Sequence, residues 1–158
     1  MAKSQNELTD EQRTIWATFQ RMSQLVHSGV ERDLQRSGLS GSDYAVLVML
    51  SEAPVDGVAV SRLGRALDWE PSRLSHHLGR MERRGLITRR ARGAGRHGAQ
   101  MLLTEEGLAV LEAAAPSHAG TVRRLFVEPL GEEQLRALGE ASAVLLAALT
   151  DDDQASCG

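Results

Sequence analysis

The sequence predicts a mainly α-helical fold: a winged helix-turn-helix with a small β-hairpin as its wing, and dimerisation helices at the N- and C-terminal ends. Three observations support this prediction. A basic, amphipathic helix is expected at residues 71–84, a short helix at 60–67 is joined to it by a tight connection, and strand-like segments follow at 86–90 and 99–104. A short helix followed closely by one that is basic on its outer face is what helix-turn-helix geometry requires.

The second of these helices has one apolar side and clear signals at both ends. Leu74, Leu78 and Met81 recur at helical spacing, so they share a stripe that can be buried. Pro71 suits a first helical turn, where its missing N–H would be unpaired anyway, and Gly85 suits the end because it tolerates a left-handed backbone. We therefore expect a helix of about 14 residues, roughly 21 Å long.

The opposite side of this helix is slim, polar and cationic. Its members are Ser72, Arg73, His76, Gly79, Arg80 and Arg83. Small polar side chains let the backbone approach a surface closely, and arginine has a planar fork that can bind guanine O6 and N7 or a phosphate. This pattern favours the major groove of a DNA duplex. The alternative is a solvated arginine face on an ordinary surface helix, which is what most charge runs are.

The segment after this helix makes the DNA-binding interpretation stronger. Residues 91–98 form a Gly/Arg/His-rich loop between the two predicted strands, as a wing does. Arg92 and Arg96, at the tip of this loop, could reach a minor groove or phosphates.

Overall composition is that of an ordinary globular chain. It has 158 residues, 42% hydrophobic and 25% charged, with five aromatic residues, so we expect one domain with a core of Leu, Val, Ala and Met. The first residues do not alternate a basic stretch with an apolar one, and no apolar run reaches membrane-spanning length, so we expect neither export nor membrane insertion. We therefore expect a cytoplasmic protein that makes no contact with a membrane.

Charge is distributed very unevenly along the chain. The net charge is −3, yet residues 61–97 contain ten arginines and three acidic residues, which gives +7 there and −10 elsewhere. Such asymmetry within one small chain is typical of binding to a polyanion.

Long amphipathic helices are predicted outside the central segment. Thr9 to Gln12 fits a capping box, and an apolar stripe continues from it to Gly38. The stripe contains Ile15, Trp16, Phe19, Met22, Val26, Val30 and Leu34. Because this helix is too long to be covered by so small a domain, the part around Trp16 and Phe19 is expected to meet a second subunit, unless it wraps its own core.

The remaining elements are assigned from their caps and breaks. Ser40 begins a helix, and the helix at 60–67 is expected to bury Leu63, Ala66 and Leu67. A helix beginning at Thr104 contains Pro116, which should kink it or break it in two. We expect residues 1–8 to be flexible and residues 151–158 to be disordered. Residues 9–150 are predicted to form one domain, in which dimerisation helices at 9–38 and 104–149 flank a winged helix-turn-helix at 40–103.

At residues 75–76, 80–87 and 102–107 the chain resembles the MarR family of bacterial transcriptional regulators. Residues 67–74 are similar to the subgroup whose recognition helices begin with Trp-Glu-Pro-Ser. The resemblance extends from about Leu8 to Leu149. It implies a homodimer, intertwined through its first and last helices, that reads a pseudo-palindromic operator, commonly represses genes, and is released by a small, often aromatic or anionic, ligand.

The resemblance also implies roles for individual residues. The helix positions that face bases would be Ser72, Arg73, Ser75, His76 and Arg80, and the wing arginine would be Arg96. One departure is that family wings usually hold an acid beside that arginine, whereas here Gly93-Ala94-Gly95 precede it. Together with the outer-face and loop arginines, the predicted DNA-binding residues are Ser72, Arg73, Ser75, His76, Arg80, Arg83, Arg92 and Arg96.

The histidines and the cysteine predict neither a metal site nor a cofactor. His27, His76, His77, His97 and His118 show no strong metal-ligand spacing, and no cysteine lies near the N-terminus, where peroxide-sensing relatives have one. His77 borders the apolar stripe and is expected to be structural. His27 and His118 could line a ligand cavity, although a core or surface position is the ordinary alternative. The single Cys157 could be a redox switch or incidental.

Two other functions fit the sequence less well than a DNA-binding regulator does. An enzyme would need a nucleophile with its base, a metal cluster or a phosphate-binding loop, and Gly93-Ala94-Gly95 lacks the strand-to-helix setting of such a loop. We therefore expect no catalytic activity. A winged helix that binds only other proteins would not need the concentration of arginines.

Overall fold

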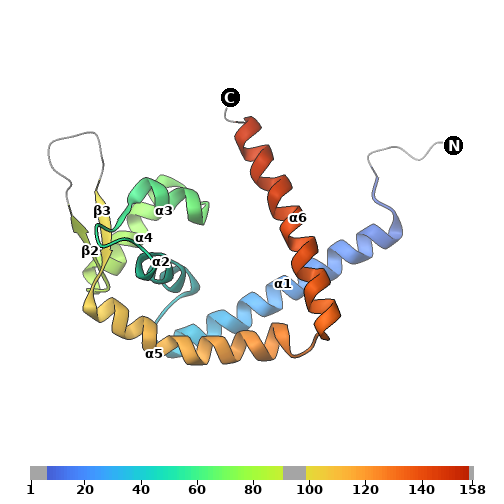
Figure 1. The fold of residues 1–158 in the computed structure, drawn as a ribbon, viewed down its shortest axis with the longest axis horizontal. Coiled ribbons are helices and arrows are strands. Elements are labelled where there is room, and N and C mark those ends of the chain that lie inside the picture. The colour runs from blue at the N-terminus through green and yellow to red at the C-terminus, as the bar shows by residue number, and fades with distance from the viewer. Residues whose placement is uncertain (1–6, 91–98, 157–158) are drawn as a thin grey trace.

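The computed structural model describes residues 7–90 and 99–156 and has two parts (Figure 1). At one end, three helices and a small sheet form a lobe. From this lobe α1 and α5 run side by side, and α6 rises at the far end of α5. The elements are α1 Asp10–Arg36, α2 Gly41–Ser51, β1 Val58–Ala59, α3 Val60–Leu67, α4 Pro71–Arg83, β2 Ile87–Arg90, β3 Gln100–Leu103, α5 Glu105–Val122, a π-helical turn Arg123–Val127, and α6 Glu132–Ser156. None of the helices in the described ranges is long and apolar enough to cross a membrane.

Side-chain caps begin the helices where the sequence predicts them. Thr9 and Gln12 form the expected capping box of α1, and Ser40 and Asp43 form another at the start of α2. In each, a hydroxyl accepts a hydrogen bond from a free backbone N–H and the partner side chain accepts one in return. The Thr104 hydroxyl caps α5 by accepting from the N–H of Gly107.

The sheet has three antiparallel strands in the order β1-β3-β2, so the prediction of a two-stranded hairpin was incomplete. β2 and β3 pair as expected, with Ile87 opposite Leu103. β1 was missed because it has only two residues, too few for an alternating pattern. It places Val58 opposite Met101 on the other edge of β3.

The core lies inside the lobe and under its junction with α1 and α5. Its fully buried side chains are mainly leucine and methionine, as the composition predicts: Leu34, Leu39, Val46, Leu47, Leu63, Leu78, Met81, Ile87 and Met101. α5 enters this core very closely, since a Cβ atom on Gly107 would lie 2.0 Å from the carbonyl oxygen of Leu86. Glycine at 107 therefore allows the first turn of α5 to contact the start of the hairpin.

Three sequence predictions are corrected by the structure. Ala66 is exposed rather than buried, because α3 turns only Leu63 fully inward. Of the two outcomes expected at Pro116, a kink or a break, the break does not occur: α5 is continuous from Glu105 to Val122, and packing along α1 continues past the proline. α6 extends to Ser156, beyond the predicted end at 149, because no Gly or Pro interrupts residues 140–156. Residues 1–6, 91–98 and 157–158, including Cys157, lie outside the described residues.

Candidate nucleic-acid interface

α4 has the two-sided character that its sequence predicts. It is 13 residues long with Pro71 in its first turn, and it buries Leu74, Leu78 and Met81. Every predicted DNA-binding residue on this helix is exposed: Ser72, Arg73, Ser75, His76, Arg80 and Arg83. These six side chains therefore share one accessible helix, whereas Arg92 and Arg96 lie outside the described residues.

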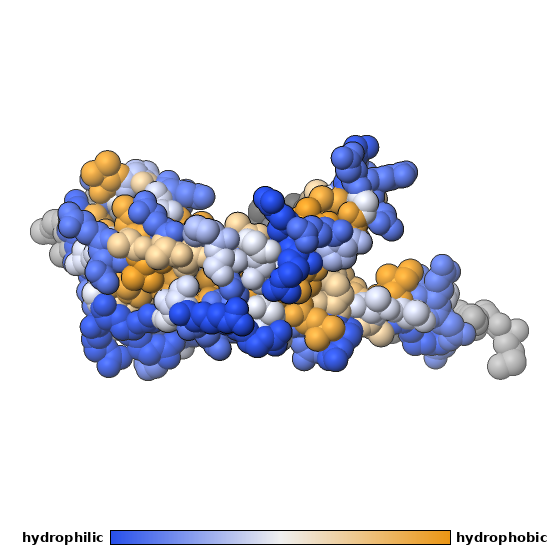
Figure 2. Space-filling model, turned by 90° about the horizontal axis from the view of Figure 1, so that it is seen from below, coloured by the Kyte–Doolittle hydropathy of each residue, from blue (hydrophilic) through white to orange (hydrophobic). Residues whose placement is uncertain are grey.

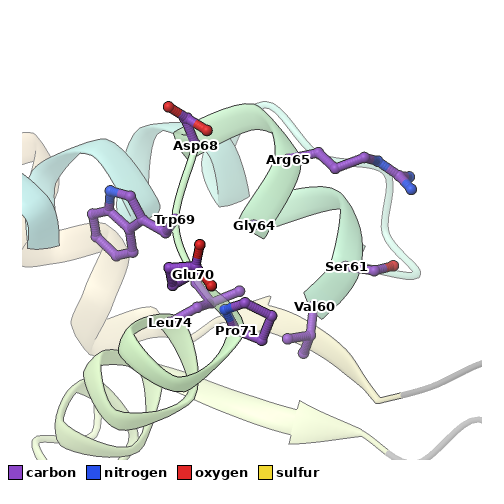
Figure 3. Close-up of a pocket in the computed structure, with 9 residues that line it drawn as sticks. All are labelled: Val60, Ser61, Gly64, Arg65, Asp68, Trp69, Glu70, Pro71 and Leu74. Atoms are coloured by element: carbon purple, nitrogen blue, oxygen red, sulfur yellow. The ribbon is translucent and has the colours of Figure 1, made fainter. Parts of the chain in front are cut away.

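The contact between α3 and α4 is apolar and close. Figure 3 shows Val60, Pro71 and Leu74 meeting at this junction, beside a cavity of about 530 Å³, while Arg65 points away from it. A Cβ atom on Gly64 would lie 3.2 Å from Cδ2 of Leu74, so glycine permits this approach. Asp68, between the helices, has a left-handed backbone with φ of 50°, which turns the chain sharply. The tight turn and the close contact together fix the angle of α4.

The arginines of the lobe are exposed, and most are free of acidic partners. Within the described part of the chain, Arg84 and Arg89 have a carboxylate within 4.0 Å. The arginines for which the same ranges contain no such carboxylate are Arg62, Arg65, Arg73, Arg80, Arg83 and Arg90. These guanidinium groups are therefore available to an external anion.

Asp43 of α2 is a buried acid that contacts α4 and the residue after it. Its Oδ2 accepts a 2.8 Å hydrogen bond from Nη1 of Arg84, whose Nη2 also donates to the carbonyl of Gly38 at 2.6 Å. Burial alone raises the pKa of Asp43. Hydrogen bonds from Ser40 and Arg84, together with the nearby Nε2 of His77, outweigh that effect and lower the pKa far below its ordinary value of 3.8. Asp43 is therefore a carboxylate at neutral pH.

His77 connects this carboxylate to the outer face of α4. The imidazole is buried, as expected for a structural residue, and its Nδ1 lies 2.8 Å from Nη2 of Arg80. Its Nε2 lies 3.1 Å from Oδ1 of Asp43, within ion-pair distance, although the N–H is not aligned well enough for a regular hydrogen bond. Trp69 packs edge-on against the ring at 5.1 Å between centroids.

Trp69 also contacts the other predicted base-reading arginine. The guanidinium carbon of Arg73 lies 4.7 Å from the centroid of the Trp69 ring, a cation–π contact. Sequence reasoning missed these contacts. The spacing of His77 to Arg80, three residues, was an available signal because such residues are neighbours on a helix. Trp69 precedes α4, so helical spacing did not link it to Arg73. No comparable signal linked His77 to Asp43, which lies on another helix.

Two other histidines, His27 and His118, have different surroundings, and His97 lies outside the described residues. His27 lines a cavity of about 370 Å³ between α1, the π-helical turn and α6, together with Phe19, Val26, Phe126 and Leu138. His118 instead packs on the ring of Tyr44, 4.4 Å between centroids. In the described part of the chain, no three His, Cys, Asp or Glu side chains gather as a metal site would require.

α3 and α4 form a helix-turn-helix with an apolar contact between them, and a three-stranded sheet lies beside it. With the exposed, basic face of α4, this arrangement defines a winged-helix DNA-binding regulator. Comparisons with known proteins agree. Residues 37–97 match the model of the MarR family. AbsC, a MarR family transcriptional regulator from Streptomyces coelicolor, is 36% identical with a TM-score of 0.87, and the match covers 92% of this chain and 99% of AbsC.

Two further structures extend the comparison. Sco3205, a MarR family transcriptional regulator from S. coelicolor solved in complex with DNA, is 30% identical with a TM-score of 0.87, covering 94% of this chain and 93% of its own. CouR from Rhodococcus jostii RHA1, solved bound to p-coumaroyl-CoA, shares the fold at 22% identity and a TM-score of 0.71, covering 83% of this chain and 90% of its own. A search of curated proteins found no match.

The chain therefore belongs to the MarR family of DNA-binding transcriptional regulators, as the sequence resemblance indicates. Members of this family regulate transcription and are not enzymes.

Proposed function

We propose that this chain is a homodimeric repressor that binds a pseudo-palindromic operator and is released by a small ligand. α4, predicted from sequence at 71–84, enters the major groove, and the wing at 91–98 enters the minor groove. The DNA-contacting residues are Ser72, Arg73, Ser75, His76, Arg80, Arg83, Arg92 and Arg96. The protein acts in the bacterial cytoplasm, where the chromosome lies.

The observation that carries this proposal is the exposed face of α4. Six polar or cationic side chains lie on a helix of 13 residues, a length of about 20 Å at 1.5 Å per residue. Its arginines Arg73, Arg80 and Arg83 have no carboxylate within 4.0 Å among the described residues. Phosphate and guanine are the DNA groups that such forks bind. The DNA complex of Sco3205, a 30% identical relative over nearly the full chain, supports the same partner.

A second copy of the chain is the partner that best suits the exposed apolar residues of α1 and α6. The stripe on α1 is buried at Leu34 but exposed at Ile15, Trp16 and Phe19, so this helix extends past its own core. Figure 2 shows apolar residues among polar ones at the end of the molecule that contains α1 and α6. Among the described side chains of α6, the large apolar ones that are exposed are Val144, Leu145, Leu146 and Leu149. Two such amphipathic helices at the chain ends suit an intertwined dimer.

The cavity beside His27 supports the small-ligand part of the proposal. It has a volume of about 370 Å³, within the range of small-molecule sites, and its walls are mainly apolar. Ser23, His27 and Ser142 add polar groups that could orient an aromatic or anionic compound. The cavity lies between α1 and α6, so a bound ligand would change how these helices pack.

The experiment that tests the proposal is selection of bound genomic fragments by the full-length protein, followed by footprinting and a reporter assay. The proposal predicts a protected site with two related half-sites and higher reporter transcription when the gene is deleted. Retention on heparin without preference for any duplex would contradict sequence-specific binding. Lower reporter transcription after deletion of the gene would contradict the repressor role, but it would not contradict the proposed DNA binding.

A further inference from the structure

We propose that His77 is a positioning residue for DNA recognition: its Nδ1 atom holds the guanidinium of Arg80 in place, and Asp43 fixes the imidazole that does so. This inference depends on the proposed function, because it assumes that Arg80 contacts DNA. It goes further by assigning part of the specificity to a buried residue that DNA does not touch.

The direction of the hydrogen bonds follows from the chemistry of the groups. An arginine guanidinium only donates, so the 2.8 Å contact between Nη2 of Arg80 and Nδ1 of His77 requires a lone pair on Nδ1. The proton of a neutral imidazole is then on Nε2. That atom lies 3.1 Å from Oδ1 of Asp43, an acceptor, so the surroundings of both ring nitrogens favour the same tautomer.

The carboxylate behind His77 is itself held firmly. Oδ2 of Asp43 accepts from Arg84 at 2.8 Å and from the backbone N–H of Ser40 at 3.0 Å. Asp43 and His77 are 5% and 6% exposed, so neither is free to turn into solvent. On its remaining side the imidazole is packed against Trp69. The ring can therefore act as a fixed acceptor for a side chain that is otherwise mobile.

Arg80 gains from such an acceptor because it is long and exposed. An arginine that contacts a base loses many rotamers on binding, and this loss weakens affinity unless the side chain is already ordered. The contact with His77 uses one guanidinium donor and leaves the others available. In contrast, Arg83 uses its Nε to bind the carbonyl of Gly79 on its own helix, so it provides a matched arginine that does not touch His77.

Two conservative substitutions separate the two contacts of His77. Asparagine in His77→Asn can place its amide oxygen near the position of Nδ1 and keep an acceptor for Arg80, but it is too short to reach Asp43. Glutamine in His77→Gln can place an amide N–H near the position of Nε2 and keep the contact with Asp43, but it offers no acceptor at Nδ1. The probe is a duplex that the wild-type protein selects from a random-sequence library, with single base-pair variants of that duplex.

We expect His77→Gln to lose discrimination at the same base pair as Arg80→Ala, by about tenfold if Arg80 makes a bidentate base contact. His77→Asn should keep most of that discrimination. In the Arg80→Ala background, neither substitution should reduce discrimination further, whereas in the Arg83→Ala background each should act as it does in the wild type. The positioning role would be overturned if both His77 variants lost affinity equally for all duplexes. It would also be overturned if the His77 substitutions had their full effects on discrimination in the Arg80→Ala background.

A spectroscopic measurement on the unmodified protein covers the case in which a His77 variant does not fold. Nitrogen-15 chemical shifts of the free protein should identify His77 as the tautomer with its proton on Nε2, and Arg80→Ala should shift the Nδ1 signal. A proton on Nδ1, or an Nδ1 chemical shift that does not change in Arg80→Ala, would overturn the inference. If Arg80→Ala leaves DNA binding unchanged while these signals appear as expected, the proposed DNA contact is wrong instead.

Discussion

Arg84, the residue that follows α4, donates a 2.8 Å hydrogen bond to the buried carboxylate of Asp43 on α2. It also donates to the carbonyl of Gly38, just before α2. The C-terminal end of α4 is therefore fixed to the connection between α1 and α2. Arg84 thus holds α4, the candidate DNA-binding helix, in place. The arginine-rich residues 61–97 therefore have a structural role as well as carrying the positive charge of this helix.

Removal of this pair should destabilise the fold. Arg84→Ala leaves Asp43 buried with fewer donors, and a hydrogen bond to a charged group contributes about 2 kcal/mol. We expect a loss of roughly that size in the free energy of unfolding by urea, measured at one protein concentration. Arg83→Ala, which removes a neighbouring exposed arginine, should change the free energy by less than about 0.5 kcal/mol. Equal effects of the two substitutions would contradict the structural role of Arg84.

The lowered pKa of Asp43 predicts a loss of stability in acid. The native state keeps Asp43 ionised below its ordinary pKa of 3.8, whereas the unfolded chain takes up a proton there. The stabilisation from this group is thus complete above pH 3.8 and is lost as the pH falls toward the native pKa. Asp43→Asn should unfold more easily than the wild type at neutral pH, and the difference should narrow in acid.

An exposed acid provides the control for this prediction. Asp56 lies in the turn after α2 and is exposed, so Asp56→Asn should follow the wild type across the same pH series. Thermal unfolding followed by circular dichroism measures all three proteins. If the difference in thermal stability between the wild type and Asp43→Asn stayed constant down to low pH, the lowered pKa of Asp43 would be contradicted.

Gly79→Ala should separate stability from DNA binding. Nothing lies within 4 Å of a Cβ atom built on this residue, and alanine favours a helix over glycine by about 0.8–1.0 kcal/mol. We therefore expect a more stable protein. The added methyl group lies on the outer face of α4, however, so affinity for the selected duplex should fall. An unchanged dissociation constant would indicate that this face does not approach DNA closely.

Charges placed on the apolar ends of α1 and α6 should separate the proposed dimer. Trp16 and Leu145 are 53% and 59% exposed in the single chain, so Trp16→Glu and Leu145→Glu should fold but bury a charge in the interface. Sedimentation equilibrium should show mainly monomers. Val55, which is 92% exposed in the turn after α2, is the control, because Val55→Glu should leave the mass unchanged. A wild-type monomer, or charged variants that remain dimeric, would contradict this interface.

The elements that the sequence predicts well are those with local signals. The stripe of α4, its proline start, the capping box of α1 and the start of α2 at Ser40 depend on residues within one or two turns, and the structure confirms them. β1 escaped prediction because two residues have no periodicity. Ala66 was placed on the wrong side because a helix of two turns leaves the width of its buried face undetermined.

The candidate site divides in the same way. The exposure of Arg73 and Arg80 follows from helical spacing, so the outer face of α4 could be predicted. The contact of His77 with Asp43 could not, because it depends on how α2 packs against α4. The sequence pattern thus predicts the residues that are proposed to contact DNA, but it does not predict the residues that orient them.

The most direct test of the central claim, that the exposed face of α4 binds DNA, is the salt dependence of affinity for the selected and an unrelated duplex. For the wild type, we predict that the logarithm of the binding constant falls linearly with the logarithm of salt concentration, because phosphate contacts release counterions. Arg73→Ala combined with Arg80→Ala should reduce the preference for the selected duplex by at least about tenfold. Binding that ignores salt, or a double variant that discriminates as well as the wild type, would contradict the claim.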